Sequence, residues 1–238
     1  MDSPGDRLIV ALDVPEVEDA RRLVAQLEGN VGVFKIGMQL QLAAGADRLI
    51  RGLVDAGKKV FLDLKYYDID ATVENAVAKA ADLGVSLLTV HWSPSTARAA
   101  ARGKGDSDLK VLCVTLLTSL DADEVKQIYG YDGPLTDFVA RRAASAVEDG
   151  CDGVIAAPTE VAAIRAAAPA HCLIVTPGIR PKGADSNDQK RIATPEAAVR
   201  DGADYLVVGR PITRAADPAA AARAVLDEMR AGFAARTV

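Results

Sequence analysis

The sequence has little cysteine and no long apolar run. Its three cysteines among 238 residues, Cys113, Cys151 and Cys172, lack the paired spacing of metal ligands. They are therefore expected to be small core residues of a protein in a reducing compartment. No apolar run approaches the roughly 20 residues of a membrane-spanning helix, and the polar N-terminus lacks the apolar core of a secretory signal. These absences predict a soluble, cytoplasmic protein without a membrane partner.

Basic blocks and histidine are also scarce. Lys and Arg total 28 against 33 Asp and Glu, a net charge of -5, and no basic residues cluster with aromatic ones. Nucleic acid is therefore not an expected partner, because binding it requires clustered positive charge. The two histidines, His91 and His171, have no second ligand at a suitable spacing. We interpret both as structural, with His91 at most a neighbour of the site, and predict no metal site.

Eight short apolar runs alternate with amphipathic, alanine-rich segments. Several runs are apolar throughout, which is typical of strands covered on both faces in a parallel sheet or barrel. The predicted strands are Leu8–Leu12, Val33–Ile36, Val60–Leu62, Leu87–Val90, Val111–Thr115, Gly153–Ala156, Leu173–Thr176 and Tyr205–Val208. The predicted helices include Val17–Leu27, Ala46–Ala56, Thr72–Leu83 and Leu135–Glu148, each leading through a glycine turn to the next strand.

This repeat favours a closed (β/α)8 TIM barrel over a doubly wound sheet. A chain of 238 residues has the size of one such barrel. The first strand leads into Leu12-Asp-Val-Pro15 and not into the glycine-rich loop of a dinucleotide-binding fold. We therefore predict a single α/β domain over residues 1–238, with residues 1–6 as a flexible N-terminal tail.

Three charged residues, Asp63, Lys65 and Asp68, lie within six positions where the third predicted strand ends. Alternation along an extended chain places Asp63 and Lys65 on the same side. A carboxylate and an ammonium that are buried together need partners, and such pairs are common in catalytic sites. The alternative is an exposed salt bridge at a strand terminus, and the spacing favours neither interpretation.

Polar residues also follow the other predicted strands, at the carboxyl ends where TIM barrels carry their active sites. Scattered salt bridges would not favour one end of the barrel, so this distribution predicts a site there. The residues are Asp13, Lys35, Asp63, Lys65, His91, Thr118, Pro177 to Arg180, Gly209 and Arg210.

The run Phe61-Leu-Asp-Leu-Lys-Tyr-Tyr-Asp-Ile69 resembles the D-x-K-x-x-D-I signature of the orotidine 5'-monophosphate decarboxylase family. Sister decarboxylases and aldolases share this signature, and the two phosphate-loop segments discriminate better. Segments that resemble the family in the same order, over nearly the whole chain, are Leu8–Asp13, Phe34–Gly37, Val90-His91, Val114–Thr118, Thr176–Pro181, Asp188–Arg191 and Val207–Thr213.

The resemblance implies decarboxylation of orotidine 5'-monophosphate (OMP) to UMP and CO2 without a cofactor, the last step of de novo UMP synthesis. It implies that Lys65 protonates a carbanion at C6 of the pyrimidine and that Asp63 faces the departing carboxylate. Lys35 would pair with Asp63. Asp68, from the neighbouring subunit of a homodimer, would complete an array of alternating charges.

Substrate contacts are implied in the same way. Asp13 would bind ribose hydroxyls, Thr72 would reach the ribose and phosphate across the dimer interface, and Thr118 would bond the pyrimidine. For Thr118, capping of the following helix is an alternative. The other residues expected to bind substrate are Ile69, Pro177, Arg180, Gln189, Gly209 and Arg210.

Two segments are expected to bind the phosphate. Gly209 and Arg210 stand between a strand and a helix start, where free amide groups and a guanidinium favour an anion. The segment 177–193 is long for a connection and rich in polar residues. We interpret it as a lid that closes over the phosphate through Arg180 and Gln189, and the alternative is a flexible surface loop.

Two other functions stay open. A sister enzyme would need a divalent metal to hold an enediolate, and a carboxylate would then be expected in place of Lys35. The second alternative is a non-catalytic barrel that binds a nucleotide. A buried charge array without a catalytic role would speak against it, because burying charges reduces stability. The chain departs from the family pattern at Trp92, where small residues are usual, and at Asp70, where proline is usual and where a helix cap is an alternative role.

Overall fold

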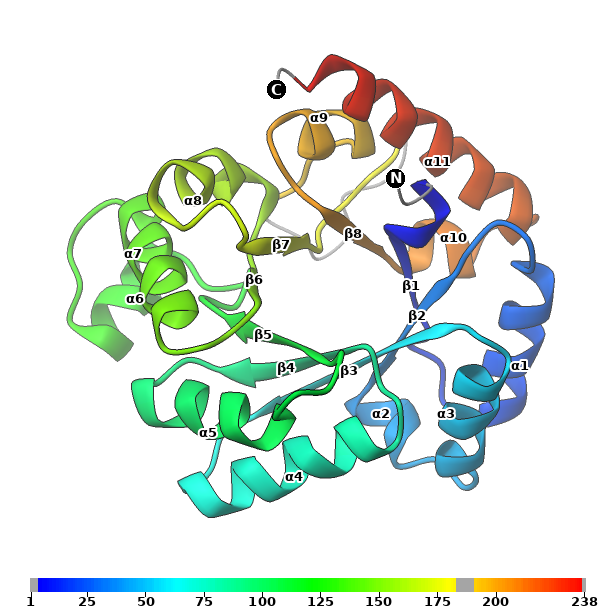
Figure 1. The fold of residues 1–238 in the computed structure, drawn as a ribbon. Helices are drawn as coiled ribbons and strands as arrows, with labels where there is room; N and C mark the ends of the chain where they lie inside the picture. Colours follow the sequence, from blue (N-terminus) through cyan, green and yellow to red (C-terminus); the bar gives the residue numbers. More distant parts are fainter. Residues whose placement is uncertain (1–3, 183–190, 237–238) are drawn as a thin grey trace.

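Eight parallel strands close into a barrel, with helices around the outside (Figure 1). This computed structural model describes residues 4–182 and 191–236. Each strand pairs with the next in the chain, and β8 returns to β1, where Ile9 lies opposite Val207. The strands are β1 (Leu8–Ala11), β2 (Val33–Gly37), β3 (Lys59–Tyr66), β4 (Leu87–His91), β5 (Lys110–Val114), β6 (Gly153–Ile155), β7 (Leu173–Thr176) and β8 (Tyr205–Val208). The predicted TIM barrel is confirmed.

The outer layer consists of α1 (Val17–Gln26), α2 (Met38–Gln41), α3 (Ala46–Asp55), α4 (Asp70–Asp82), α5 (Pro94–Lys104), α6 (Ala122–Tyr129), α7 (Leu135–Glu148), α8 (Val161–Ala167), α9 (Pro195–Arg200), α10 (Arg210–Thr213) and α11 (Pro218–Ala235), with 3-10 turns η1 (Pro4–Asp6) and η2 (Pro158–Glu160). The four predicted helices are present, with ends shifted by at most two residues. None of the helices in the described part of the chain has the length and apolar character needed to cross a membrane.

Apolar side chains fill both sides of the barrel wall. Along β1, Ile9 and Ala11 point into the barrel, while Leu8 and Val10 pack against the helices. This two-sided burial explains why the strands are apolar throughout. The three cysteines are free and buried, as predicted. The residues that fill the barrel interior are Ile9, Ala11, Val33, Phe61, Leu87, Leu112, Val175 and Val207.

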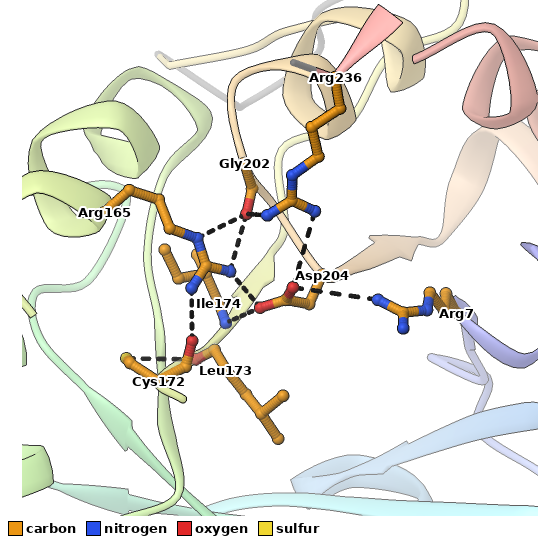
Figure 2. A network of polar contacts seen from close by, with 8 residues as sticks. All are labelled: Arg7, Arg165, Cys172, Leu173, Ile174, Gly202, Asp204 and Arg236. Atoms are coloured by element: carbon orange, nitrogen blue, oxygen red, sulfur yellow. Dashed lines mark hydrogen bonds and ion pairs between the residues drawn. The ribbon is translucent and has the colours of Figure 1, made fainter. Parts of the chain in front are cut away.

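A polar network around Asp204 closes the amino-terminal end of the barrel (Figure 2). The Asp204 carboxylate accepts hydrogen bonds from Arg165 and from the backbone N–H of Ile174, the latter at 2.8 Å. Arg7 and Arg236, from the two ends of the chain, lie 3.9 and 3.8 Å from the same carboxylate. The network therefore joins the first and last segments of the chain where β8 meets β1.

The third strand is longer than predicted. It continues to Tyr66 because its pairing with β2 extends to Gly37 opposite Asp63, and its pairing with β4 resumes at Tyr66 after a register shift. Asp63 and Lys65 therefore lie within the strand and not after it. Their charge suggested a strand end because a soluble protein rarely places charged residues inside a barrel wall.

The N-terminal segment and the start of α4 also differ in detail from the predictions. In the described part of the predicted tail, Pro4–Asp6 forms η1, and the Gly5 carbonyl accepts a hydrogen bond from the N–H of Gly32. Asp70 is the first helical residue of α4 and not its cap, which is Ile69. Its carboxylate instead lies 3.7 Å from Arg102 on α5.

Candidate active site

A cavity of about 640 Å3 opens at the carboxyl end of the barrel. It brings together most of the residues predicted for the site, from six different strands or the segments that follow them. Those that line it are Asp13, Lys35, Asp63, Lys65, Thr118, Pro177, Arg180, Gly209 and Arg210. Asp68, Ile69 and Thr72 are exposed and lie outside this lining. Gln189 lies outside the described residues.

Four of the lining residues form a chain of alternating charges. Lys35 Nζ lies 2.9 Å from Asp13 Oδ1 and 3.6 Å from Asp63 Oδ2. Lys65 Nζ lies 2.8 Å from Asp63 Oδ1. The side chains of Lys35 and Asp63 are only 9% and 18% exposed. This geometry is not the exposed salt bridge considered as the alternative, because the central pair is largely removed from water.

The central carboxylate, Asp63, is held in its ionised form. Burial has the largest single influence and raises the pKa of Asp63. The neighbouring ammonium groups of Lys35 and Lys65, with hydrogen bonds from Lys65 and Thr89, outweigh burial and lower the pKa below its ordinary value. At neutral pH the array therefore contains a buried anion between two cations.

Thr89, on β4, also belongs to this arrangement, although the sequence analysis did not select it. Its hydroxyl donates a hydrogen bond to Asp63 Oδ1 at 3.0 Å and accepts one from the backbone N–H of Lys65 at 2.9 Å. A hydroxyl inside the otherwise apolar run Leu87–Val90 was the available signal, because a buried hydroxyl needs partners.

Arg180 and Arg210 also line the cavity. Gly209 follows β8, and Arg210 begins α10. Arg180 is buried, and burial followed by the charge of Arg210 lowers its pKa. Two neighbouring guanidiniums repel each other, and an anion bound between them relieves this repulsion. The part of the cavity lined by Arg180 and Arg210 therefore suits an anionic group.

The two ends of the segment 177–193, both within the described residues, are joined by a backbone hydrogen bond. Arg180 N–H donates to the Ala193 carbonyl at 2.9 Å. Arg191 pairs with the buried carboxylate of Glu160 and donates to the carbonyls of Leu117 and Thr118 at 3.1 and 3.3 Å. The end of this segment is thus joined to the loop after β5.

Thr118 lines the cavity and does not cap the following helix. The cap of α6 is Asp121, whose side chain accepts a hydrogen bond from the N–H of Glu124 at 3.1 Å. The capping alternative for Thr118 is therefore wrong.

His91, the last residue of β4, and Trp92, which follows it, have charged and aromatic neighbours. His91 is half-buried, and its pKa is lowered by burial and then by the charges of Lys65 and Arg142. Trp92 packs over the Arg142 guanidinium at 4.8 Å, which gives this unusual residue a structural role. Within residues 4–182 and 191–236, no three His, Cys, Asp or Glu side chains gather in an arrangement that could hold a metal ion.

A closed (β/α)8 barrel with a charged cavity at the carboxyl ends of its strands belongs to the class of barrel enzymes. Residues 6–225 match the model of the family described as orotidine 5'-phosphate decarboxylase / HUMPS. The chain is 50% identical over 228 residues to the orotidine 5'-phosphate decarboxylase of Nitrobacter winogradskyi, covering 96% of this chain and 94% of that protein.

Two further relatives agree. The orotidine 5'-phosphate decarboxylase of Methylobacterium sp. (strain 4-46) is 52% identical over 230 residues, covering 95% of this chain and 97% of that protein. The crystal structure of orotidine 5'-phosphate decarboxylase from Lactobacillus acidophilus superposes with a TM-score of 0.82 at 37% identity, covering 94% of this chain and 99% of that chain. The chain belongs to the orotidine 5'-phosphate decarboxylase / HUMPS family, which confirms the resemblance found in the sequence.

Proposed function

We propose that this protein decarboxylates OMP to UMP and CO2, the last step of de novo UMP synthesis, without a metal or other cofactor. The observation that carries the proposal is the alternating charge array of Asp13, Lys35, Asp63 and Lys65, whose central Lys35–Asp63 pair is largely buried, in a chain of this family. The names of the chain's relatives support the substrate.

The array suits the chemistry of this reaction. When the bond between C6 and the carboxylate breaks, its electron pair stays on C6 as a vinyl carbanion for which the ring has no electron sink. Lys65 Nζ would stabilise this charge and transfer its proton to C6, and solvent would then reprotonate the amine. Asp63 would face the substrate carboxylate, so that their repulsion is relieved when CO2 leaves.

The other parts of the cavity would bind the ribose and the phosphate. Asp13, whose carboxylate is exposed in the cavity, would accept hydrogen bonds from ribose hydroxyls. Arg180 and Arg210 would hold the phosphate, together with Gln189 and the backbone at Pro177 and Gly209. A cavity of about 640 Å3 suits a nucleotide. Thr118 would form a hydrogen bond with the pyrimidine.

The active form would be a homodimer. Four large apolar side chains, Met38, Leu42, Tyr67 and Ile69, are exposed on the segments that follow the neighbouring strands β2 and β3. A group of exposed apolar residues beside a site is typical of an interface. A second copy docked there would supply Asp68 and Thr72 to the cavity.

A metal-dependent sister enzyme is the main alternative, since the matched family description includes a second name. Lys35 speaks against it, because its ammonium lies 3.6 Å from Asp63 and would repel a divalent cation held by that carboxylate.

The deciding assay follows the loss of OMP ultraviolet absorbance with wild-type protein in excess chelator. The proposal predicts turnover that the chelator does not change. Turnover of sugar phosphates that requires magnesium would indicate the sister enzyme. Binding of UMP without turnover of either substrate would indicate a nucleotide-binding barrel.

A further inference from the structure

Thr89 joins the two central members of the charge array through a single hydroxyl. The side chain lies on β4 and is fully buried. The hydroxyl donates to Asp63 Oδ1 at 3.0 Å and accepts from the backbone N–H of Lys65 at 2.9 Å. Thr89 does not line the cavity, so it reaches a substrate only through these two residues.

The hydrogen bond to Lys65 supports an unusual backbone conformation. Lys65 has φ of +53° and is the only non-glycine residue with positive φ in the described part of the chain. Such a conformation is strained for a residue with a side chain and persists only where the surroundings hold it. It coincides with the register shift between Leu62 and Tyr66 in the pairing of β3 with β4. Within this shift, the N–H of Lys65 is satisfied by the Thr89 hydroxyl.

The hydrogen bond to Asp63 holds the carboxylate in one orientation. Oδ1 accepts from both Thr89 and Lys65 Nζ, while Oδ2 faces Lys35. Rotation of the carboxylate would break all three interactions. The same hydrogen bond also helps to lower the pKa of Asp63, against the larger opposing effect of burial.

We propose that Thr89 is a positioning residue that holds Lys65 and Asp63 in the geometry needed for decarboxylation. This inference rests on the proposed function. Without the hydroxyl, Lys65 loses the support of its left-handed backbone and Asp63 loses a fixed donor, so the ammonium and carboxylate sample other arrangements. A misplaced proton donor lowers the rate of the chemical step more than it lowers substrate binding.

The test compares Thr89→Val, which keeps the shape and removes the hydroxyl, with Thr89→Ser, which keeps the hydroxyl. The control is Thr96→Val on α5, because Thr96 is also buried and its hydroxyl accepts a hydrogen bond from Ser93 at 2.8 Å, away from the cavity. For each protein, kcat and KM for OMP, the Kd of UMP and the Tm are measured.

Thr89→Val is expected to lower kcat about 10- to 100-fold, the range for a hydrogen bond to a charged group, while KM and the Kd of UMP change less than about threefold. Thr89→Ser should recover most of kcat, and Thr96→Val should keep it. In Thr89→Val the acid limb of kcat/KM should move to higher pH, because Asp63 loses a donor. If Thr89→Val does not fold, Thr89→Ala is expected to give the same separation of kcat from UMP binding.

Wild-type kcat in a folded hydroxyl-free variant would overturn the positioning role, and so would an equal fall of kcat in Thr96→Val. These results differ from failure of the proposed function itself, in which the wild type would not turn over OMP at all.

Discussion

At the scale of single residues, the site depends on charges that are buried next to opposite charges. Asp63 lies between two lysines and keeps its negative charge in spite of burial. Removing one partner from such a set leaves an uncompensated charge, which is costly when that charge is buried. The electrostatics of Asp63 should therefore appear in the stability of the protein as well as in its activity.

The first prediction concerns Asp63 and acid. A carboxyl whose pKa is lower in the folded than in the unfolded state, where it is about 4, contributes stability at pH values above that unfolded pKa. The contribution is lost as the pH falls through the folded pKa. We expect the free energy of unfolding of the wild type, measured with urea, to fall more steeply below about pH 4 than that of Asp63→Asn. The exposed variant Asp82→Asn should retain the wild-type slope, and equal slopes for Asp63→Asn and wild type would contradict the account.

The second prediction concerns the thiols. Burial raises the pKa of Cys172 to about 11 and also raises that of Cys113. The thiolate is the reactive form, so these cysteines should be inert at pH 8. We expect no rapid reaction of the native protein with a thiol reagent and reaction of all three cysteines in urea. Rapid labelling of Cys172 in the native protein would show that the end of the barrel around it opens readily.

At the scale of elements, α7 packs against the segment after β4 through the buried guanidinium of Arg142, which stacks on aromatic rings. The guanidinium of Arg142 lies 4.8 Å from the ring centres of Trp92 and Tyr129 and 5.0 Å from that of Phe138. Trp92 directly follows β4, Tyr129 ends α6 and Phe138 lies on α7 itself.

The third prediction follows from this cluster. Trp92→Ala should reduce the free energy of unfolding by about 3 kcal/mol, because it removes a large packed ring and one face of the cation site. Trp92→Phe should recover about half of the loss. Urea unfolding followed by circular dichroism measures both. A loss below about 1 kcal/mol for Trp92→Ala would mean that Trp92 is not part of the core that holds α7.

The elements could be predicted from the sequence where local pattern decides them. Continuous apolar runs identified the eight strands, because burial on both faces leaves little choice of residue. The end of β3 was misplaced, since Asp63 and Lys65 are charged yet continue the ladder with β2. Thr89 was not found because its role depends on the register between β3 and β4, which the sequence does not display. Arg142 was missed for the same reason, since its partners are brought to it by three separate elements.

At the scale of the whole molecule, the network that joins the chain ends and the charged cavity lie at opposite ends of the barrel. The Asp204 network holds the chain ends at the amino-terminal mouth, while the charged cavity lies at the carboxyl-terminal mouth. The exposed apolar residues after β2 and β3 lie at the carboxyl-terminal mouth as well. Assembly is therefore expected to complete the site, and the fold itself is expected to depend on the opposite end.

The fourth prediction tests assembly. Wild-type protein should sediment as a dimer of the 24.9 kDa chain. Leu42→Asp should shift it toward monomer and lower kcat more at low than at high protein concentration, because Leu42 is 85% exposed in one chain and belongs to the proposed interface. Ile128→Asp, which changes another exposed apolar residue on α6, should do neither. A fully active monomer of Leu42→Asp would contradict a site shared between subunits.

The central claim is that Lys65 donates the proton to C6 from within the charge array. The most direct measurement is kcat for OMP of Lys65→Ala in the presence of chelator, with the Kd of UMP measured on the same protein. The account predicts a fall in kcat of about 100- to 10,000-fold, the contribution of a positioned general acid, with UMP still bound. A kcat within tenfold of the wild-type value would contradict the account, because another group would then have to supply the proton.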